Sequence, residues 1–335
     1  MRAARLEAIR TLALREVAKP RPGPGELLVR VEAVGICGSD RHMFKGEYPT
    51  ALPVTLGHEF CGIVAEVGEG VSRFRGGERV TGDPNIACGW CARCREGRPN
   101  LCDKLTAIGV FRDGGFADCV IVPEGQAYGL PGDLDPLHGA FCEPLACCLH
   151  GLDVARIQPG DSVAVLGGGV IGLLMVQLAA RAGARRIAMV TRQPVRRAVA
   201  ISLGATEAID PADEPVAALR DAVGGGADVV LECAGVPETF VQGLRMARRG
   251  GAFVLFGVMP AGVAVPVVPF DLLVNELRIE SAWLNPFTHQ RAADMVAAGT
   301  LELDRLISRT IGLDDVPGVV GAPAAAGDIK VIAVP

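Results

Sequence analysis

Hydrophobic residues follow two different patterns along the chain. Up to about residue 140, short apolar runs separated by glycine and proline stand at residues 26–37, 57–68, 77–82 and 116–123. Short strands at such spacing are typical of a barrel-like all-β unit. Residues 1–20 lack a continuous apolar run, so they predict two opening strands rather than a signal segment.

From about residue 150, apolar runs alternate with segments of helical periodicity. The predicted strands cover residues 162–167, 186–191, 228–235 and 251–258, and the predicted helices cover 169–183, 196–205 and 238–250. This alternation predicts βαβ units around a parallel sheet. Residues 285–299 predict a further helix and 328–335 a closing strand.

The uncharged stretch 250–270 is long enough to suggest a membrane span. It contains three prolines and four glycines, which favour two strands and a loop instead. We therefore expect no membrane partner and a cytoplasmic protein.

Length, charge and cysteine count further limit the number of domains, the class of protein and its partners. A chain of 335 residues predicts two domains. The formal net charge of -5 argues against a nucleic-acid partner, which requires a basic surface. An odd count of 11 cysteines in a long chain does not suggest a secreted disulfide scaffold.

A glycine motif marks a nucleotide site in the second half. Gly167, Gly169 and Gly172 form G-x-G-x-x-G between a predicted strand and a predicted helix. The glycines permit a tight turn, a close approach to a pyrophosphate and close helix packing, and the helix N-terminus favours the anion. We expect Val170, Ile171, Gly257 and Val258 to contact the dinucleotide as well.

The end of the second predicted strand bears on which dinucleotide is bound. An acidic residue there would hold the ribose 2′-hydroxyl of NAD, but this chain has Thr191 followed by Arg192, with Arg196 one turn later. Arginine can bind a 2′-phosphate, so NADP is preferred over NAD. The alternative is that these arginines are only a solvated helix start.

Four cysteines, Cys88, Cys91, Cys94 and Cys102, stand within fifteen residues as C-x2-C-x2-C-x7-C. An iron–sulfur motif would have its last cysteine sooner and followed by proline, and a thioredoxin-type pair would lie near a βαβ unit. Four thiolates suit tetrahedral zinc with no open position. The spacing therefore predicts a structural zinc site, with the charge of nearby arginines (Arg93, Arg95, Arg98) offsetting that of the thiolates.

A second group of candidate ligands is scattered through the chain. Cys37, His58, Glu59 and Glu143 could supply one thiolate, one imidazole and a carboxylate, which would leave a fourth zinc position open for chemistry. Each also has an ordinary explanation as a core cysteine, a loop histidine or a helix-start charge.

These motifs, in this order, resemble the zinc-dependent medium-chain dehydrogenases, especially the sorbitol (polyol) and threonine dehydrogenase branch. The resemblance covers nearly the whole chain and rests on GPGELLVRVEAVGICGSD, GHEFCGIVAEVGEGV, the cysteine segment, GGFADCVIVP, EPLACCLHG and GGGVIG. It implies an α/β protein with a GroES-like catalytic domain (1–145 and 285–335), a Rossmann domain (146–284) and a cleft between them.

The resemblance also implies two zinc ions per chain. The structural zinc would take the four clustered cysteines, and the catalytic zinc would take Cys37, His58 and a carboxylate from Glu59 or Glu143. Cys147 would share a helix face with Glu143 and is a rival ligand.

The implied reaction is hydride transfer between an alcohol and a nicotinamide. Zinc would activate the hydroxyl, Ser39 would take its proton first, and His42 would release it to solvent, as imidazole can near neutral pH. A surface role is the alternative for His42. Met43, Phe116 and Leu284 are candidates for the pocket wall.

We expect a sugar alcohol, cyclitol or related secondary alcohol as substrate, because a site with one thiolate and one carboxylate suits vicinal diols. Threonine and simple alcohols are alternatives. A zinc-free NADPH quinone reductase and a non-catalytic NADP sensor are rivals from other classes. A homodimer or homotetramer is expected, with residues 263–269 as a possible intersubunit strand.

Overall fold

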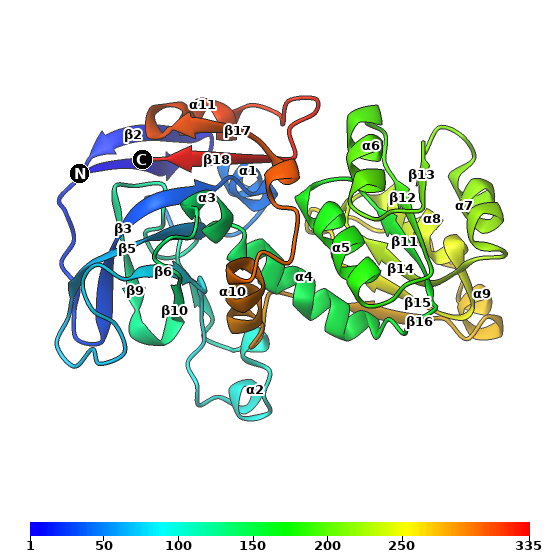
Figure 1. Cartoon of the computed structure of the whole chain (residues 1–335), viewed down its shortest axis with the longest axis horizontal. Helices are drawn as coiled ribbons and strands as arrows, with labels where there is room; N and C mark the ends of the chain where they lie inside the picture. Colours follow the sequence, from blue (N-terminus) through cyan, green and yellow to red (C-terminus); the bar gives the residue numbers. More distant parts are fainter. The chain divides into compact units, whose positions relative to one another are not determined.

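The computed structural model describes all residues 1–335, which divide into two compact units (Figure 1). The first unit comprises Met1–Ala146 and Leu284–Pro335, and the second comprises Cys147–Trp283. Helix α4 (Cys142–Ala155) contains the boundary between them.

The first unit is built on a seven-stranded sheet. Its order is β10 (Ala127–Leu130), β6 (Arg79–Gly82), β5 (Glu59–Val67), β3 (Glu26–Gly35), β18 (Lys330–Val334) and β17 (Ile307–Gly312), with β9 (Cys119–Pro123) also paired to β3. A second sheet joins β2 (Thr11–Glu16), β1 (Arg2–Ala8) and β4 (Val54–Thr55). The predicted β-rich unit and both opening strands are therefore present.

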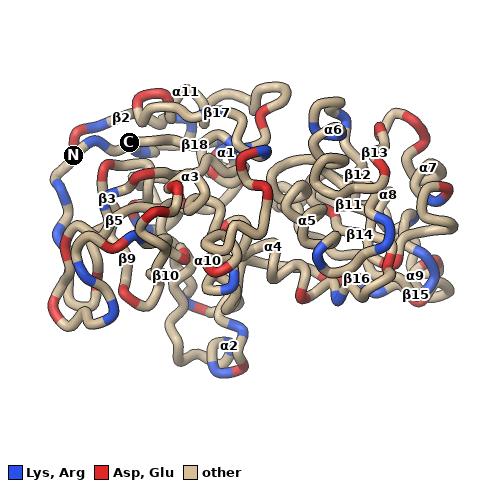
Figure 2. The backbone as a smooth tube through the Cα atoms, viewed as in Figure 1, with Lys and Arg blue, Asp and Glu red and all other residues tan.

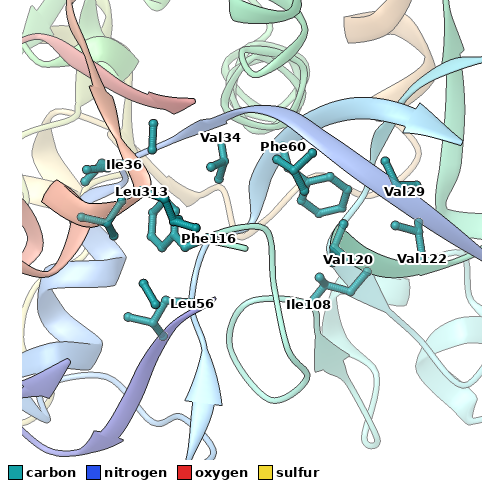
Figure 3. Close-up of a cluster of buried hydrophobic side chains, with 14 of the residues drawn as sticks. Val29, Val34, Ile36, Leu56, Phe60, Ile108, Phe116, Val120, Val122 and Leu313 are labelled. Carbon is teal, nitrogen blue, oxygen red and sulfur yellow. The ribbon is translucent and has the colours of Figure 1, made fainter. Parts of the chain in front are cut away.

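The core of this unit lies between these strands and their loops (Figure 3). Phe60 and Phe116 are completely buried there, together with Val29, Val34 and Leu56. Each such large side chain contributes about 1.5–3 kcal/mol when it is removed from water. The chain's end supplies β18 to this sheet, so the carboxyl-terminal segment completes the first unit.

Shorter elements surround the sheets of the first unit. They are α1 (Gly38–Lys45), β7 (Asn85–Ile86), α2 (Ala92–Arg95), η1 (Pro99–Leu101), β8 (Thr106–Ala107), η2 (Glu124–Gln126), α3 (Pro136–Gly139), α10 (His289–Ala297), η3 (Asp304–Leu306), η4 (Leu313–Asp315) and α11 (Val316–Gly321). Residues 85–107, with α2 and η1, form a lobe that we call the cysteine lobe.

The second unit is a parallel six-stranded sheet with helices. Its order is β13 (Glu207–Ile209), β12 (Arg186–Val190), β11 (Ser162–Leu166), β14 (Ala227–Glu232), β15 (Ala247–Leu255) and β16 (Arg278–Ser281). The helices are α5 (Val170–Arg181), α6 (Pro194–Ser202), α7 (Pro215–Val223), α8 (Pro237–Met246) and α9 (Pro269–Val274). The central strands are buried and apolar, as parallel strands covered on both faces require.

One secondary-structure prediction is wrong. Residues 250–270 contain the end of β15, but residues 256–268 form no strand, and α9 begins at Pro269. Pro266 and Pro269 lack the N–H groups that strand pairing needs. The sheet continues instead through β16, and residues 263–268 pair with no strand of this chain. None of the helices is long and apolar enough to cross a membrane.

Candidate active site and nucleotide-binding turn

The four clustered cysteines meet in the cysteine lobe. The Sγ atoms of Cys88, Cys91, Cys94 and Cys102 lie within 4.8 Å of one another. Sγ–Sγ distances are 3.5 Å for Cys91–Cys94, 3.9 Å for Cys91–Cys102 and 4.0 Å for Cys88–Cys94. Zinc–sulfur bonds of about 2.3 Å in a tetrahedron separate the sulfurs by about 3.8 Å. The donor set therefore fits zinc.

Backbone N–H groups stabilise thiolates in this lobe. The Cys91 amide lies 3.4 Å from the Cys88 sulfur, and the Lys104 amide lies 3.3 Å from the Cys102 sulfur. Hydrogen bonds from the backbone at Cys94 and Asp103 lower the pKa of Cys91 to about 6. Burial, followed by the neighbouring Cys91 sulfur, raises the pKa of Cys94 to about 12. Without a cation, the Cys94 thiol would therefore keep its proton near neutral pH, so a cation is needed to hold all four cysteines as thiolates.

Basic residues lie on α2 and directly after it, as the blue segments of the tube in Figure 2 show. Arg93 and Arg95 lie on α2, and Arg98 follows it. All three are exposed, and Arg93 pairs with Glu96 at 2.5 Å. Part of the positive charge expected to offset the thiolates is therefore already compensated by a carboxylate.

A second potential metal site lies where β3 and β5 pair. Donor atoms of Cys37, His58 and Glu59 lie within 4.8 Å of one another. Gly35 is opposite Glu59 in the antiparallel register, so the segment after β3 meets the start of β5. This register brings together residues that are separate in sequence.

Asp40, which was not recognised from the sequence, lies beside two of these residues. Its carboxylate accepts a hydrogen bond from the Cys37 N–H at 2.9 Å and lies 3.5 Å from Nδ1 of His58. Asp40 is completely buried at the third position of α1. An acidic residue three positions after the residue that precedes a helix is a recognisable capping signal.

The site favours positive charge. Burial lowers the pKa of His58, but Asp40 and Cys37 raise it by more, so the pKa lies well above its ordinary value. The buried Nδ1 atom of His58 and Oδ1 atom of Asp40 have no hydrogen-bond partner. An environment that attracts a proton to a buried imidazole also suits a metal cation.

Lys330 is a further residue that the sequence patterns did not identify. Its Nζ contacts the Glu59 carboxylate and donates to the Ile36 carbonyl at 3.2 Å. A lone lysine within the apolar closing strand is the sequence signal that could have indicated a buried ion pair.

The remaining carboxylate and cysteine candidates lie on α4. Glu143 is buried, and its charge acts on Lys330, but its carboxylate is not part of the group formed by Cys37, His58 and Glu59. Cys147, one helical turn later, is the first residue of the second unit. Of the two carboxylates, the structure therefore brings Glu59 closer to Cys37 and His58.

The two residues of the expected proton route lie on α1. Ser39 Oγ is 3.2 Å from Nε2 of His58. His42, one turn further on, has its Nδ1 atom 2.7 Å from Oε2 of Glu47. Ser39 is thus in contact with a candidate metal ligand, and His42 is partly exposed to solvent.

Two of the pocket-wall candidates are core residues. Met43 and Phe116 are completely buried, so neither presents a surface to a ligand; this prediction was wrong for both. Leu284 is half-buried at the start of the second segment of the first unit.

In the second unit, the glycine motif forms a turn from β11 into α5. Gly167 has φ of 105°, which an L-amino acid rarely adopts. A Cβ atom on Gly172 would lie 1.9 Å from the Gly167 carbonyl oxygen. Any larger residue at position 172 would therefore prevent α5 from packing this closely against the turn. Gly169 precedes the first helical residues, Val170 and Ile171. The turn leaves backbone N–H groups at a helix N-terminus for an anion.

The end of β12 lies beside this turn. Thr191 is buried, and a Cβ atom on Gly168 would lie 2.7 Å from its Oγ1. Arg192 is exposed, whereas Arg196 is half-buried. Arg197 donates to the carbonyls of Thr191 at 2.7 Å and Arg192 at 3.0 Å.

Arg197 is also 2.8 Å from Asp210 after β13. It therefore braces the segment that presents Arg192, a role that the sequence did not distinguish from those of its neighbours.

Glu232, at the end of β14, organises the next loops. Its carboxylate accepts hydrogen bonds from the N–H groups of Ala234 and Gly235, both at 2.9 Å, and from the Thr239 hydroxyl at 2.7 Å. A Cβ atom on Gly257 would lie 2.2 Å from the Gly235 nitrogen, so the loop after β15 packs closely against the loop after β14. Val258, the next residue, is exposed.

Comparisons with known proteins agree with these sites. Residues 23–132 match the alcohol dehydrogenase GroES-like domain, and residues 170–298 match the zinc-binding dehydrogenase family. Sorbitol dehydrogenase of Halalkalibacterium halodurans is 39% identical over 77% of this chain and 76% of its own length. L-idonate 5-dehydrogenase of Vitis vinifera is 34% identical over 98% of this chain and 93% of its own length.

The fold is similar to solved structures over its whole length. A zinc-binding dehydrogenase of Sinorhizobium meliloti 1021, described as bound to NADP, is 55% identical, with a TM-score of 0.97 over 100% of this chain and 99% of that one. The chain belongs to the zinc-dependent medium-chain dehydrogenase family. The predicted family, the GroES-like and Rossmann fold, and the class of alcohol or polyol dehydrogenase are confirmed.

Proposed function

We propose that this dehydrogenase oxidises a secondary hydroxyl of a polyol and uses NADP as its hydride acceptor. The observation that carries the proposal is the convergence of Cys37, His58 and Glu59, with donor atoms within 4.8 Å. One thiolate, one imidazole and one carboxylate match a catalytic zinc shell with a position left for substrate.

Two groups of residues would hold zinc. Cys37, His58 and Glu59 would bind the catalytic ion, with Glu143 or Cys147 as replacements for Glu59, and the four cysteines of the cysteine lobe would bind the structural ion. When bound at the first site, zinc supplies a Lewis acid that makes a hydroxyl easier to deprotonate.

The chain's own groups would then position the substrate and move its proton. Asp40 holds the Cys37 backbone and faces the His58 ring, which preserves the arrangement of the site. Ser39, in contact with His58, would accept the hydroxyl proton, and His42, one turn further along α1, would release it to solvent.

NADP is favoured by the residues beside the glycine turn. Thr191 replaces the acidic side chain that would repel a 2′-phosphate, and Arg192 is exposed with its backbone held by Arg197. The similar protein from Sinorhizobium meliloti is described as bound to NADP. Arg196, Gly257 and Val258 complete the proposed cofactor site.

The polyol assignment is supported by the sorbitol and L-idonate dehydrogenases among the relatives. Threonine is the second candidate because L-threonine 3-dehydrogenase of Rhizobium rhizogenes is 31% identical over 91% of this chain.

We further propose residues 1–145 and 285–335 as the catalytic domain and residues 146–284 as the nucleotide domain. We also propose a cytoplasmic location and a homodimer or homotetramer.

The test is an oxidation assay on zinc-replete protein. Sugar alcohols and cyclitols would be pooled, offered with NADP or with NAD, and monitored by the absorbance of reduced nicotinamide. Turnover with NADP supports the proposal, and dividing the pool then identifies the substrate. Turnover with L-threonine alone would replace the polyol assignment, and turnover with NAD alone would contradict the role of Arg192.

A further inference from the structure

The turn that ends α1 places a carboxylate on His42. Gly46 adopts a left-handed conformation, and its N–H donates to the Met43 carbonyl at 3.0 Å. The next N–H, of Glu47, donates to the His42 carbonyl at 2.8 Å. The chain is thereby folded back, and Oε2 of Glu47 lies 2.7 Å from Nδ1 of His42. The contact is thus a consequence of the helix cap.

The contact determines which ring nitrogen carries hydrogen. An ionised carboxylate can only accept hydrogen bonds, so Nδ1 of His42 must be the donor. A neutral imidazole has one N–H, which leaves the lone pair on Nε2. The side chains of His42 and Glu47 are 31% and 37% exposed, so water can reach the pair.

We propose that Glu47 is a positioning residue that fixes the Nδ1–H tautomer of His42 and makes Nε2 the atom that receives the substrate's proton. The inference rests on the proposed function, since it deepens the proton route from Ser39. Nε2 gains the proton, the resulting imidazolium remains paired with Glu47, and the same Nε2–H then passes to water. The neutral tautomer is thereby restored, with no net change in the protein.

Three residues on α1 and in the turn that follows it thus have separate tasks. Ser39 is in contact with His58, His42 lies one turn further on, and Glu47 acts through His42 alone. Similar carboxylate–histidine pairs fix the tautomer of a catalytic base in other enzymes. A surface ion pair that only secures the helix end would not affect the reaction in this way.

The tautomer can be measured directly in the metal- and cofactor-free full chain. With only 5 histidines, ¹⁵N-histidine labelling in alkaline buffer resolves the ring nitrogens, and H42Q identifies the His42 signals. We expect hydrogen on Nδ1 in the natural chain, a shift of the hydrogen toward Nε2 in E47A, and retention on Nδ1 in E47Q, whose amide oxygen still accepts. An unchanged His42 tautomer in E47A would overturn the proposal.

Kinetics on the zinc-replete protein provide the second readout. We expect kcat to fall about 10- to 100-fold in E47A, with the KM of the alcohol little changed, and to recover largely in E47Q. E69A, at an exposed loop glutamate of the same unit, is the control and should match the natural chain. Equal kcat values in E47A and E69A would also overturn the inference.

The two readouts separate this inference from the proposed function. If the natural chain oxidises no polyol, the polyol assignment fails, and the inference for that reaction fails with it. If the chain turns over normally but E47A retains its tautomer, the role of Glu47 alone is wrong.

Discussion

The ammonium group of Lys330 contacts the carboxylate of Glu59 inside the first unit, where their side chains are 0% and 2% exposed. The two residues are 271 positions apart, so the closing strand brings a cation to a candidate metal ligand. Despite burial, the pKa of Lys330 is raised, chiefly by Glu59. The pair therefore compensates a buried negative charge beside Cys37 and His58.

Removing this lysine should destabilise the protein. In K330M, Glu59 would be buried without its partner, and we expect the free energy of unfolding to fall by about 3–5 kcal/mol. Denaturant unfolding of metal-free protein measures this change. The double variant E59Q/K330M should recover much of the loss, because no uncompensated charge remains. A loss below about 1 kcal/mol in K330M would show that the pair is not buried as described.

The same pair shows where sequence patterns lose information. Helices and parallel strands follow local periodicity, and the four cysteines of the cysteine lobe are close in sequence, so both were predicted from residues. Cys37 and His58 meet through the register of β3 and β5, and a resemblance to a family was needed to connect them. Lys330 reaches Glu59 from the far end of the chain, which no local pattern encodes.

Residues 263–268 illustrate the opposite error. Their β-branched, uncharged sequence suggested a strand, but pairing depends on available N–H groups and on a neighbouring edge. Pro266 supplies no N–H, and β16 occupies the edge beside β15. Composition therefore predicted the wrong local structure because it does not specify partners.

The cysteine lobe should hold one zinc ion independently of the other site. In C91S, three sulfurs remain, and we expect the zinc content after dialysis to fall from about two ions per chain to about one. Limited proteolysis should then cut within residues 85–107. Elemental analysis gives the zinc count, and C119S, at a buried cysteine outside the cluster, is the control. Zinc that is unchanged in C91S and also in the double variant C91S/C94S would exclude this lobe as a metal site.

Arg192 should determine the choice of cofactor. A charge-assisted hydrogen bond contributes about 1.5–3 kcal/mol, so R192Q should lower kcat/KM for NADP about 10- to 100-fold. The value for NAD should change little, since NAD has no 2′-phosphate. R185Q is the matched control, because Arg185 is exposed just before the opposite end of the same strand, β12. Equal losses with both cofactors would indicate a structural role for Arg192.

Asp83 should make stability depend on pH. Burial, opposed by hydrogen bonds from Asn85 and Asn285, raises the pKa of its carboxyl from 3.8 to about 6. The folded chain therefore retains a proton that the unfolded chain has already released between these values. This contribution to stability is complete below about pH 4 and is lost as the pH rises through about 6.

An asparagine at position 83 has no such proton and keeps the oxygen that accepts from Asn85 at 2.9 Å. Compared with the natural chain, D83N should therefore become increasingly more stable as the pH rises from about 4 to about 7, with a final difference of about 1–3 kcal/mol. The lower part of this range allows for the partial exposure of Asp83, which reduces the full effect. Denaturant unfolding across this pH range gives the difference, and D133N, at an exposed aspartate of the same unit, should show none. Parallel stability curves for D83N and the natural chain would mean that the carboxyl of Asp83 ionises as freely in the folded protein as in the unfolded one.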